Sequence, residues 1–239
     1  QNSFKHRILY YGPNSEQEIL DILKKYHRVR ETLKEVPAAK EFPRLETPTT
    51  KIYIAPYKAK QIYMSQYSNN GEKYDQTIEP IRTLYNEYFS GSMNAIVFQE
   101  MREARALAYS AWAGFNAPGN LKYTYNMRSQ IATQNDKMLD AIGAFNDIIN
   151  NMPQSENAFK LAKEAIISRL RTERITKNAV LWNYISAQDL GLTADRRIKL
   201  FNEVQNMNIQ DVVNFQEKWV KDRTYTYCIL GDEKDLDMN

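Results

Sequence analysis

Apolar residues in the middle of this chain recur first at one spacing and then at another, and its fold must satisfy both patterns. From Met93 to Arg105 apolar residues recur at helical spacing, whereas LKYTYNMR, residues 121–128, alternates apolar and polar side chains. The first pattern predicts an amphipathic helix and the second a strand with one buried face. Each such element can bury its apolar face only against another layer. The chain is therefore expected to contain both helices and strands.

The residues that carry these two patterns can be named. The helical stripe consists of Met93, Val97, Met101 and Ala104, and the apolar face of the predicted strand consists of Leu121, Tyr123, Tyr125 and Met127. A turn at Ala117-Pro118-Gly119-Asn120 precedes that strand. LAYSAWAGF, residues 107–115, also has strand character, so the two segments are expected to form a hairpin.

Further elements follow on both sides of this hairpin. HRILYY, residues 6–11, is interpreted as a buried strand, and a helix is predicted over 15–27, where Ser15 and Glu18 have capping-box spacing. Two short strands are predicted within 51–68, broken near Pro56, and a helix over 79–89. From Gln134 to about Val220 the pattern is nearly all helical, in about five segments. A last strand is predicted over 224–230.

Prolines suggest a division of the chain. Pro37, Pro43 and Pro48 occur in a polar stretch, which argues against helix and indicates an extended linker over 37–49. The strand, glycine and acidic turn of RILYYGPNSEQEIL return in YTYCILGDEKDLDM, which suggests related modules at the two ends. We therefore expect residues 1–36 to be the tail of one module and residues 50–239 to be a complete module. Alternatively, the likeness reflects only how common strand-glycine-helix units are.

Composition and charge restrict the partners. The net charge of +3, from 32 basic and 29 acidic residues, is too small to create a strong field for nucleic acid. No run approaches the roughly 18 apolar residues that span a bilayer, so no membrane span is predicted. The single cysteine, Cys228, excludes an internal disulfide but leaves the compartment open. The chain begins at Gln1, so a removed export signal, and with it a periplasmic location, stays one option.

The segment from Tyr88 to Gly114, YFSGSMNAIVFQEMREARALAYSAWAG, closely resembles part of the insulinase-like (M16) zinc peptidases. It has a small-residue loop, a helix and then an arginine followed by leucine-alanine-tyrosine. The order of the other elements agrees over essentially the whole chain. The resemblance implies two homologous halves that close around a peptide, and each half is expected to be an α+β module with a mixed, largely antiparallel sheet covered by several helices. Only the first half carries the zinc motif His-x-x-Glu-His. This chain is similar to the second half, with residues 1–36 similar to the tail of the first.

By this resemblance, Arg102 and Tyr109 are the site residues, assisting catalysis by contacting the substrate. The tyrosine hydroxyl would contact the scissile carbonyl, and the guanidinium would orient that carbonyl or the neighbouring backbone. Donors aimed at the oxygen on which charge develops lower the barrier of such a reaction. In the alternative reading, Arg102 pairs with Glu100, Glu103 or another acid, and Tyr109 packs in the hairpin. Ala106 stands where the family usually has glycine, which would strain the backbone if that position requires positive φ.

Metal chemistry is not expected from this chain alone. A catalytic zinc site needs several close ligands, yet the only histidines are His6 and His27, and neither occurs in His-x-x-Glu-His. We expect both to be structural or surface residues, no cofactor in this chain, and zinc on the missing catalytic half. The chain alone is thus predicted to be inactive, as the substrate-binding half of a zinc endopeptidase that acts on peptides or unfolded proteins. Alternatively, it is a catalytically inactive structural or partner subunit of the same fold.

Two weaker features have ordinary explanations. The loop Ser90-Gly91-Ser92-Met93-Asn94 lacks a phosphate-loop pattern and is expected to begin a helix with Ser92 or a neighbour as its cap. A basic set is expected to form a solvated helix face, with the lining of a chamber for acidic peptides as the alternative. Its members are Arg169, Arg171, Arg174, Lys177, Arg196 and Arg197.

Overall fold

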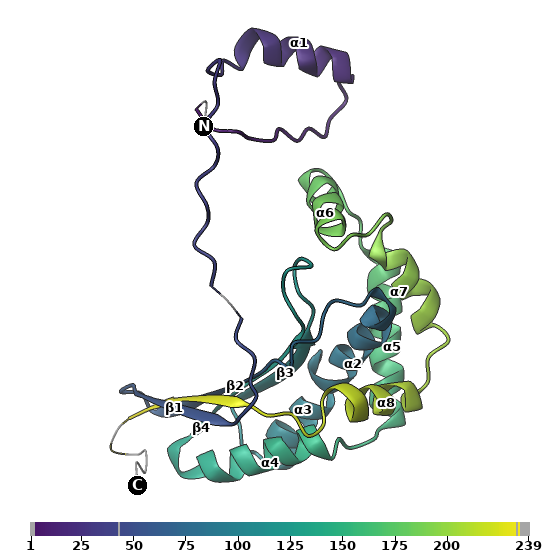
Figure 1. The fold of residues 1–239 in the computed structure, drawn as a ribbon. Helices are drawn as coiled ribbons and strands as arrows, with labels where there is room; N and C mark the ends of the chain where they lie inside the picture. The colour runs from purple at the N-terminus through teal and green to yellow at the C-terminus, as the bar shows by residue number, and fades with distance from the viewer. Residues whose placement is uncertain (1–2, 43, 233, 235–239) are drawn as a thin grey trace.

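A five-stranded mixed sheet forms the centre of the structure, a computed structural model that describes residues 3–42, 44–232 and 234 (Figure 1). The strand order is β1-β5-β2-β4-β3, in which β1 and β5 are parallel and the other neighbours antiparallel. This sheet and the helices confirm the predicted α+β class. The strands are β1 (Lys51–Pro56), β2 (Gln61–Ser68), β3 (Ser110–Asn116), β4 (Asn126–Gln134) and β5 (Thr226–Gly231).

Helices cover one face of the sheet and leave the other face open (Figure 1). The alternation of β2 shows this division, since Ile62, Met64 and Gln66 are buried while Tyr63 and Tyr67 are only half-buried. The α-helices are α1 (Glu16–Tyr26), α2 (Glu79–Ser90), α3 (Ile96–Phe98), α4 (Met138–Asn150), α5 (Glu156–Thr172), α6 (Asn178–Asp189), α7 (Arg196–Val204) and α8 (Ile209–Trp219). The helical region after residue 134 thus has the five predicted α-helices, α4 to α8.

Phe115 lies at the centre of the aromatic core between β3 and α8. Its ring stacks on Tyr125 at 5.3 Å and meets Phe215 edge-on at 5.5 Å, both measured between ring centroids. Phe115 is fully buried. Each such aromatic pair stabilises a protein by roughly 0.5–1.5 kcal/mol beyond the contribution from burying its apolar surface. The guanidinium of Arg223 lies over the same ring at 5.4 Å. A charged residue therefore joins the edge of the core.

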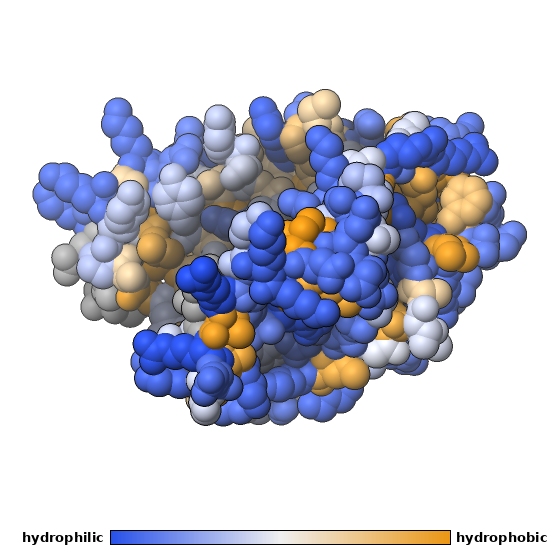
Figure 2. Space-filling model, turned by 90° about the horizontal axis from the view of Figure 1, so that it is seen from above, coloured by the Kyte–Doolittle hydropathy of each residue, from blue (hydrophilic) through white to orange (hydrophobic). Residues whose placement is uncertain are grey.

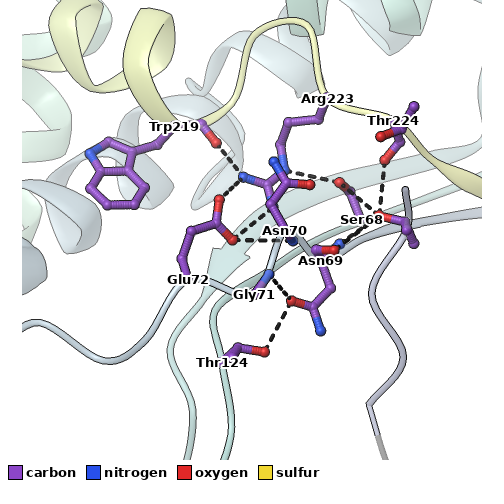
Figure 3. A network of polar contacts seen from close by, with 10 residues as sticks. Ser68, Asn69, Asn70, Gly71, Glu72, Thr124, Trp219, Arg223 and Thr224 are labelled. Atoms are coloured by element: carbon purple, nitrogen blue, oxygen red, sulfur yellow. Dashed lines mark hydrogen bonds and ion pairs between the residues drawn. The ribbon is translucent and has the colours of Figure 1, made fainter. Parts of the chain in front are cut away.

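Arg223 is the hub of a polar network that fixes three distant segments to one another (Figure 3). Its guanidinium donates to both carboxylate oxygens of Glu72, at 2.6 and 3.2 Å, and to Ser68 Oγ at 3.0 Å. It also donates to the carbonyl of Trp219 at 2.8 Å. Only 3% of its side chain is exposed. The connection from α8 to β5 is thereby tied to the end of β2.

The end of the proline-containing segment is held at the same place. Thr47 is buried, its backbone N–H donates to the carbonyl of Asn69 at 2.9 Å, and its hydroxyl accepts from the Asn69 N–H at 2.9 Å. Its hydroxyl also donates to the carbonyl of Thr224 at 3.3 Å. The described residues of 37–49 form neither helix nor strand. The chain thus enters the module as an extended segment that is anchored at Thr47.

The prediction of a buried strand over 6–11 is wrong. These residues are exposed and extended, and the single backbone bridge of this region joins Phe4 to Lys34. Helix α1 follows with the predicted capping box, in which Ser15 Oγ accepts from the Glu18 N–H at 3.3 Å and Glu18 accepts from the Ser15 N–H at 2.7 Å. This helix buries no residue and lies apart from the two layers (Figure 1). A strand needs a neighbouring strand for its backbone groups, and the described part of the chain offers none here.

The second strand of the hairpin begins later in the sequence than predicted. The alternation over 121–128 predicted a strand there, but β4 begins at Asn126 and continues to Gln134, while Leu121 is exposed. Before β4 the backbone bonds to another segment, since Tyr125 N–H donates to the carbonyl of Glu72 at 2.9 Å. The later part of β4 buries polar residues that interrupt the apolar pattern. Ser129 Oγ, for example, donates to Gln66 Oε1 at 2.6 Å.

The predicted helix over 93–105 also differs. Its regular α-helical part is short, Ile96–Phe98, and it continues as a π-helix over Gln99–Ala104. Val97 and Met101 of the expected stripe are buried, but Met93 and Ala104 are exposed. Ser92 is not the cap, because the helix begins after Ala95 without a side-chain cap. The loop before it instead has Ser92 Oγ accepting from the Asn94 N–H at 3.3 Å.

Candidate functional site

Arg102 and Tyr109 lie on either side of the transition from helix to sheet. Arg102 is within the π-helix, which has a wider turn than an α-helix and is frequent at functional sites. Tyr109 comes directly before β3, and its backbone N–H donates to the carbonyl of Ala132 in β4 at 2.9 Å. The two residues therefore belong to one connection between the helical layer and the edge strand of the sheet.

This connection is held by hydrogen bonds at both ends. The N–H groups of Leu107 and Ala108 both donate to the carbonyl of Met101, at 2.9 and 3.2 Å. On the sheet side, Thr133 Oγ1 donates to the carbonyl of Leu107 at 2.5 Å, and Lys137 Nζ donates to the carbonyl of Ala106 at 3.2 Å. The backbone between the two candidate residues is therefore fixed to β4 and to the π-helix.

Ala106 has a positive φ of 49° at the centre of this connection. An L-residue rarely adopts the left-handed region, and its Cβ makes that conformation costly. The strain that we considered for an alanine in place of the usual glycine is therefore present. The hydrogen bonds around Ala106 nevertheless hold the backbone in this conformation.

The side chains of Arg102 and Tyr109 are accessible to a ligand. Tyr109 is 70% exposed, and 52% of the Arg102 side chain is exposed. The closest acidic oxygen to Arg102, on Glu103, is 3.9 Å away, and the guanidinium lies over the Phe98 ring at 5.1 Å. Glu100 instead binds Arg105, at 3.3 Å. The alternative expectation, in which Tyr109 packs in the hairpin, does not match this exposure. The distance between Arg102 and Glu103 is long for an ion pair.

The described residues contain no hydrogen bond between Arg102 and Tyr109. Each donor group is directed by its own element and presented separately. Two donors that do not occupy one another are available for the oxygen atoms of a bound backbone. The arrangement can therefore bind a peptide carbonyl, although it contains no base or nucleophile positioned for hydrolysis among these residues.

The open face of the sheet carries aromatic side chains. Trp112 is 42% exposed, and its Nε1 donates to Gln130 Oε1 at 3.2 Å on the neighbouring strand. The sheet register places Gln130 opposite Ser65 and Ser65 opposite Cys228, whose neighbour on β1 is Tyr53. Sequence reasoning did not single out Trp112. Its position two residues after the start of β3, on the same face as Gln130, follows only from the register.

The tyrosines divide between core and surface. Tyr85, Tyr88 and Tyr125 are fully buried, whereas Tyr53 and Tyr57 are more than half exposed. The buried ones hydrogen-bond within the core, as when Tyr125 Oη donates to Glu79 Oε1 at 2.7 Å. Burial raises the pKa of Tyr125 well above its usual range, with the charge of Glu79 as the second cause. These buried tyrosines are structural residues.

The two histidines lie together but do not form a zinc site. His6 Nε2 and His27 Nε2 are 2.7 Å apart, a contact that their separation in the sequence did not suggest. His6 Nδ1 lies 2.7 Å from the carbonyl oxygen of Phe4. In the described residues, no third histidine, cysteine or carboxylate joins them in a group that could hold a metal ion. A catalytic zinc ion needs about three protein ligands, so these residues do not fit one.

Comparison with known proteins was made on sequence and on structure. A family model described as the peptidase M16 inactive domain matches residues 7–166, more than half of the chain. A search of curated proteins found no match. In the part of the chain that the structure describes, no helix has both the length and the apolar character required to cross a membrane.

Solved structures with the same fold come from several bacteria. A peptidase M16 inactive domain from Pseudomonas fluorescens aligns with a TM-score of 0.64 and 16% identity, over 84% of this chain and 47% of that one. A protease from Helicobacter pylori aligns at 0.63 and 12%, over 91% and 53%. The periplasmic protease PqqL from Escherichia coli aligns at 0.65 and 11%, over 93% and 25%. The chain thus spans about half or less of these proteins, and identities this low show the fold alone.

Proposed function

Because this chain belongs to the peptidase M16 inactive-domain family, we propose that it is the substrate-binding, non-zinc half of a zinc-dependent endopeptidase. A catalytic M16 half, in the same longer chain or in a separate subunit, is then its partner. The substrate is a peptide or an unfolded protein segment held between the two halves. Fold alone does not define a substrate, so the proposal depends on the residues of the candidate site.

The observation that carries the proposal is the exposure of two donors, which do not bind one another, on a fixed connection. The Tyr109 hydroxyl and the Arg102 guanidinium are accessible, and the backbone between them is bound to β4 and to the π-helix. A donor that is already held in place loses little freedom when negative charge develops on a substrate oxygen. A rigid phenol and a permanently charged, forked guanidinium suit this role.

In this proposal the two residues have different tasks. Tyr109 donates a hydrogen bond to the scissile carbonyl oxygen, and this bond strengthens as the oxygen becomes negative. Arg102 donates to that oxygen or to the neighbouring peptide group and so orients the substrate backbone. The catalytic zinc ion belongs to the partner half, since His6 and His27 do not fit it. That ion would supply the activated water, and this chain would supply binding and orientation.

The test is the substitution Tyr109→Phe in the chain combined with its catalytic half. We expect turnover to fall by roughly 10²–10³-fold, the range for losing one oxyanion donor, with a much smaller change in substrate affinity. Steady-state kinetics on a fluorogenic peptide would separate kcat from KM. The matched control is Tyr57→Phe, since Tyr57 is also exposed, at 55%, but follows β1 on the opposite edge of the sheet from β3. Unchanged turnover for Tyr109→Phe would reject this role and favour an inactive structural or partner subunit.

A further inference from the structure

A polar cavity lies where the start of α2, the end of α5 and the start of α7 meet. Its volume is about 280 Å³, and residues from these helices and from the segment before α2 line it. The lining contains five cationic side chains, Arg82, Arg169, Arg196, Arg197 and Lys199, against the two acids Glu79 and Glu173. Three of these cations belong to the basic set that we expected to be a solvated helix face. The cavity therefore has a positive field that favours an anion.

Most of the cations in this cavity are already paired, and Arg196 is not. Arg82 binds Glu79 through two hydrogen bonds of 2.9 and 3.0 Å. Arg169 lies 3.1 Å from Glu87, Arg197 binds Asp195, and Lys199 lies 3.5 Å from Glu203. Arg196 makes no ion pair or hydrogen bond with any residue that the structure describes. Its guanidinium is thus the donor free to meet a ligand.

Tyr74 contributes a second unused donor to the same cavity. Its ring stacks on Tyr125, with 6.1 Å between centroids, and its hydroxyl is buried without a hydrogen-bond partner among the described residues. Burial raises the pKa of Tyr74, with Glu79 as the second cause, so the hydroxyl stays protonated at neutral pH. A buried hydroxyl without a partner is unfavourable, and a bound acceptor would remove that penalty.

An apolar cavity adjoins the polar one and shares part of its wall. It has a volume of about 510 Å³ and is formed by α6 and the loop that leads to α7, including Val180, Trp182, Leu190 and Leu192. Arg196 lines both cavities. Helix α6 buries none of its residues and leaves Trp182 64% exposed. Figure 1 places α6 beside α7, and Figure 2 shows from above that hydrophobic residues occur in small groups between hydrophilic ones.

We propose that these two cavities form one subsite for a peptide residue in which a carboxylate lies next to an apolar side chain. The carboxylate enters the polar cavity and accepts from Arg196 and Tyr74, and the apolar side chain packs against Trp182 in the neighbouring cavity. Glu173 in the polar cavity disfavours a doubly charged phosphate relative to a singly charged carboxylate. That the ligand is a peptide rests on the proposed function, whereas the anion preference rests on the cavity itself.

Two sources can supply this carboxylate, a peptide C-terminus or an acidic side chain, and three probes distinguish them. The first probe is acetyl-Ala-Ala-Leu with a free C-terminus, the second is its C-terminal amide, and the third is acetyl-Ala-Leu-Glu amide. Binding to the full chain is measured by calorimetry and by tryptophan fluorescence, because Trp182 lines the site. We expect at least one carboxylate probe to bind about tenfold more tightly than the amide, in the range of a charge-assisted hydrogen bond.

The matched variants are Arg196→Gln and Arg174→Gln. Both remove one positive charge, but Arg174 lies in the connection after α5, and its side chain donates only to backbone carbonyls. Arg196→Gln should weaken carboxylate binding about tenfold, and Tyr74→Phe should weaken it less, while Arg174→Gln should leave it unchanged. The proposal is overturned by equal affinity for acid and amide probes, by no effect of Arg196→Gln, by an equal effect of Arg174→Gln, or by no binding at millimolar peptide.

This binding test separates the subsite from the proposed function. It needs neither zinc nor the catalytic half, whereas the Tyr109→Phe test measures turnover of the combined protein. Carboxylate binding that depends on Arg196 together with unchanged turnover of Tyr109→Phe would leave the subsite standing and reject the catalytic role of Tyr109. Carboxylate binding that does not depend on Arg196, together with reduced turnover of Tyr109→Phe, would reject the subsite and leave the catalytic role of Tyr109 standing.

Discussion

The backbone of Ala106 carries strain next to the residues that we propose to contact the substrate. Its φ is 49°, and a left-handed conformation costs an L-residue roughly 1–2 kcal/mol. The hydrogen bonds of its neighbours to Met101 and Thr133 hold this conformation. The orientation of Tyr109 therefore depends on a conformation that the local sequence does not favour.

Replacing Ala106 by glycine should raise the free energy of unfolding by about 1 kcal/mol, because glycine adopts positive φ without steric cost and loses only part of this gain through a more flexible unfolded chain. Urea denaturation would show a higher midpoint with an unchanged slope. The control is Ala104→Gly, two residues earlier in the π-helix and without positive φ, which should lower stability. A lower midpoint for Ala106→Gly would show that Ala106 is not strained.

At the scale of elements, the Arg223 network decides how the end of the chain joins the sheet. The connection between α8 and β5 contains Arg223, and its guanidinium satisfies Glu72, Ser68 and the carbonyl of Trp219 in a site with little solvent. Removing one partner of a buried ion pair leaves the other charge without compensation. The network should therefore be more sensitive to single substitutions than the ion pairs on the surface.

Arg223→Met should lower the free energy of unfolding by about 3 kcal/mol, since Glu72, with 19% of its side chain exposed, would lose its partner in a site with little solvent. Lys221→Met is the matched control two residues earlier, because Lys221 pairs with Glu217 on the exposed surface at 2.9 Å. This control should leave the urea midpoint nearly unchanged. The double variant Arg223→Met with Glu72→Leu should recover part of the loss. Equal effects of the two single substitutions would show that burial adds nothing to this pair.

The elements that the sequence predicted well are those with a local signal. The capping box of Ser15 and Glu18, the break at Pro56 and the helical periods after Gln134 all correspond to observed elements. Elements that depend on distant neighbours were predicted poorly. The polar residues Ser129 and Thr133 are buried in β4 because Gln66 and the Leu107 carbonyl bond to them, and no local pattern contains that information.

The candidate site was predictable only in part, for the same reason. The identity of Arg102 and Tyr109 came from a resemblance, whereas their exposure and their separate presentation came from the structure. The π-helix was not predicted, because its wider turns preserve part of a helical period and keep Val97 and Met101 buried. The subsite around Arg196 joins segments more than a hundred residues apart, such as Tyr74 and α7. Periodicity cannot reveal contacts over such separations.

At the scale of the whole molecule, residues 3–36 and the sheet-helix body differ in how they are stabilised. Helix α1 buries none of its residues, and the apolar side chains of Ile8, Leu9, Tyr10 and Tyr11 are exposed. The body from Thr47 onward has one continuous core of buried side chains contributed by the sheet and the helices. This contrast supports the proposal that residues 1–36 are the tail of a preceding module, whose own sheet would cover the apolar residues of 6–11.

Two truncations test this division. Removing residues 1–36 should leave the urea midpoint of the remaining chain unchanged, because the described part of this segment, residues 3–36, adds no buried side chain to the core. Removing residues 1–50 should lower the midpoint, since it also removes Thr47, which is 5% exposed and hydrogen-bonds to Asn69 and Thr224. Loss of these hydrogen bonds leaves the backbone groups of Asn69, after β2, and Thr224, before β5, without their partners. If the shorter truncation already unfolds the body, residues 1–36 are an integral part of this module, and the proposed boundary at 37–49 is wrong.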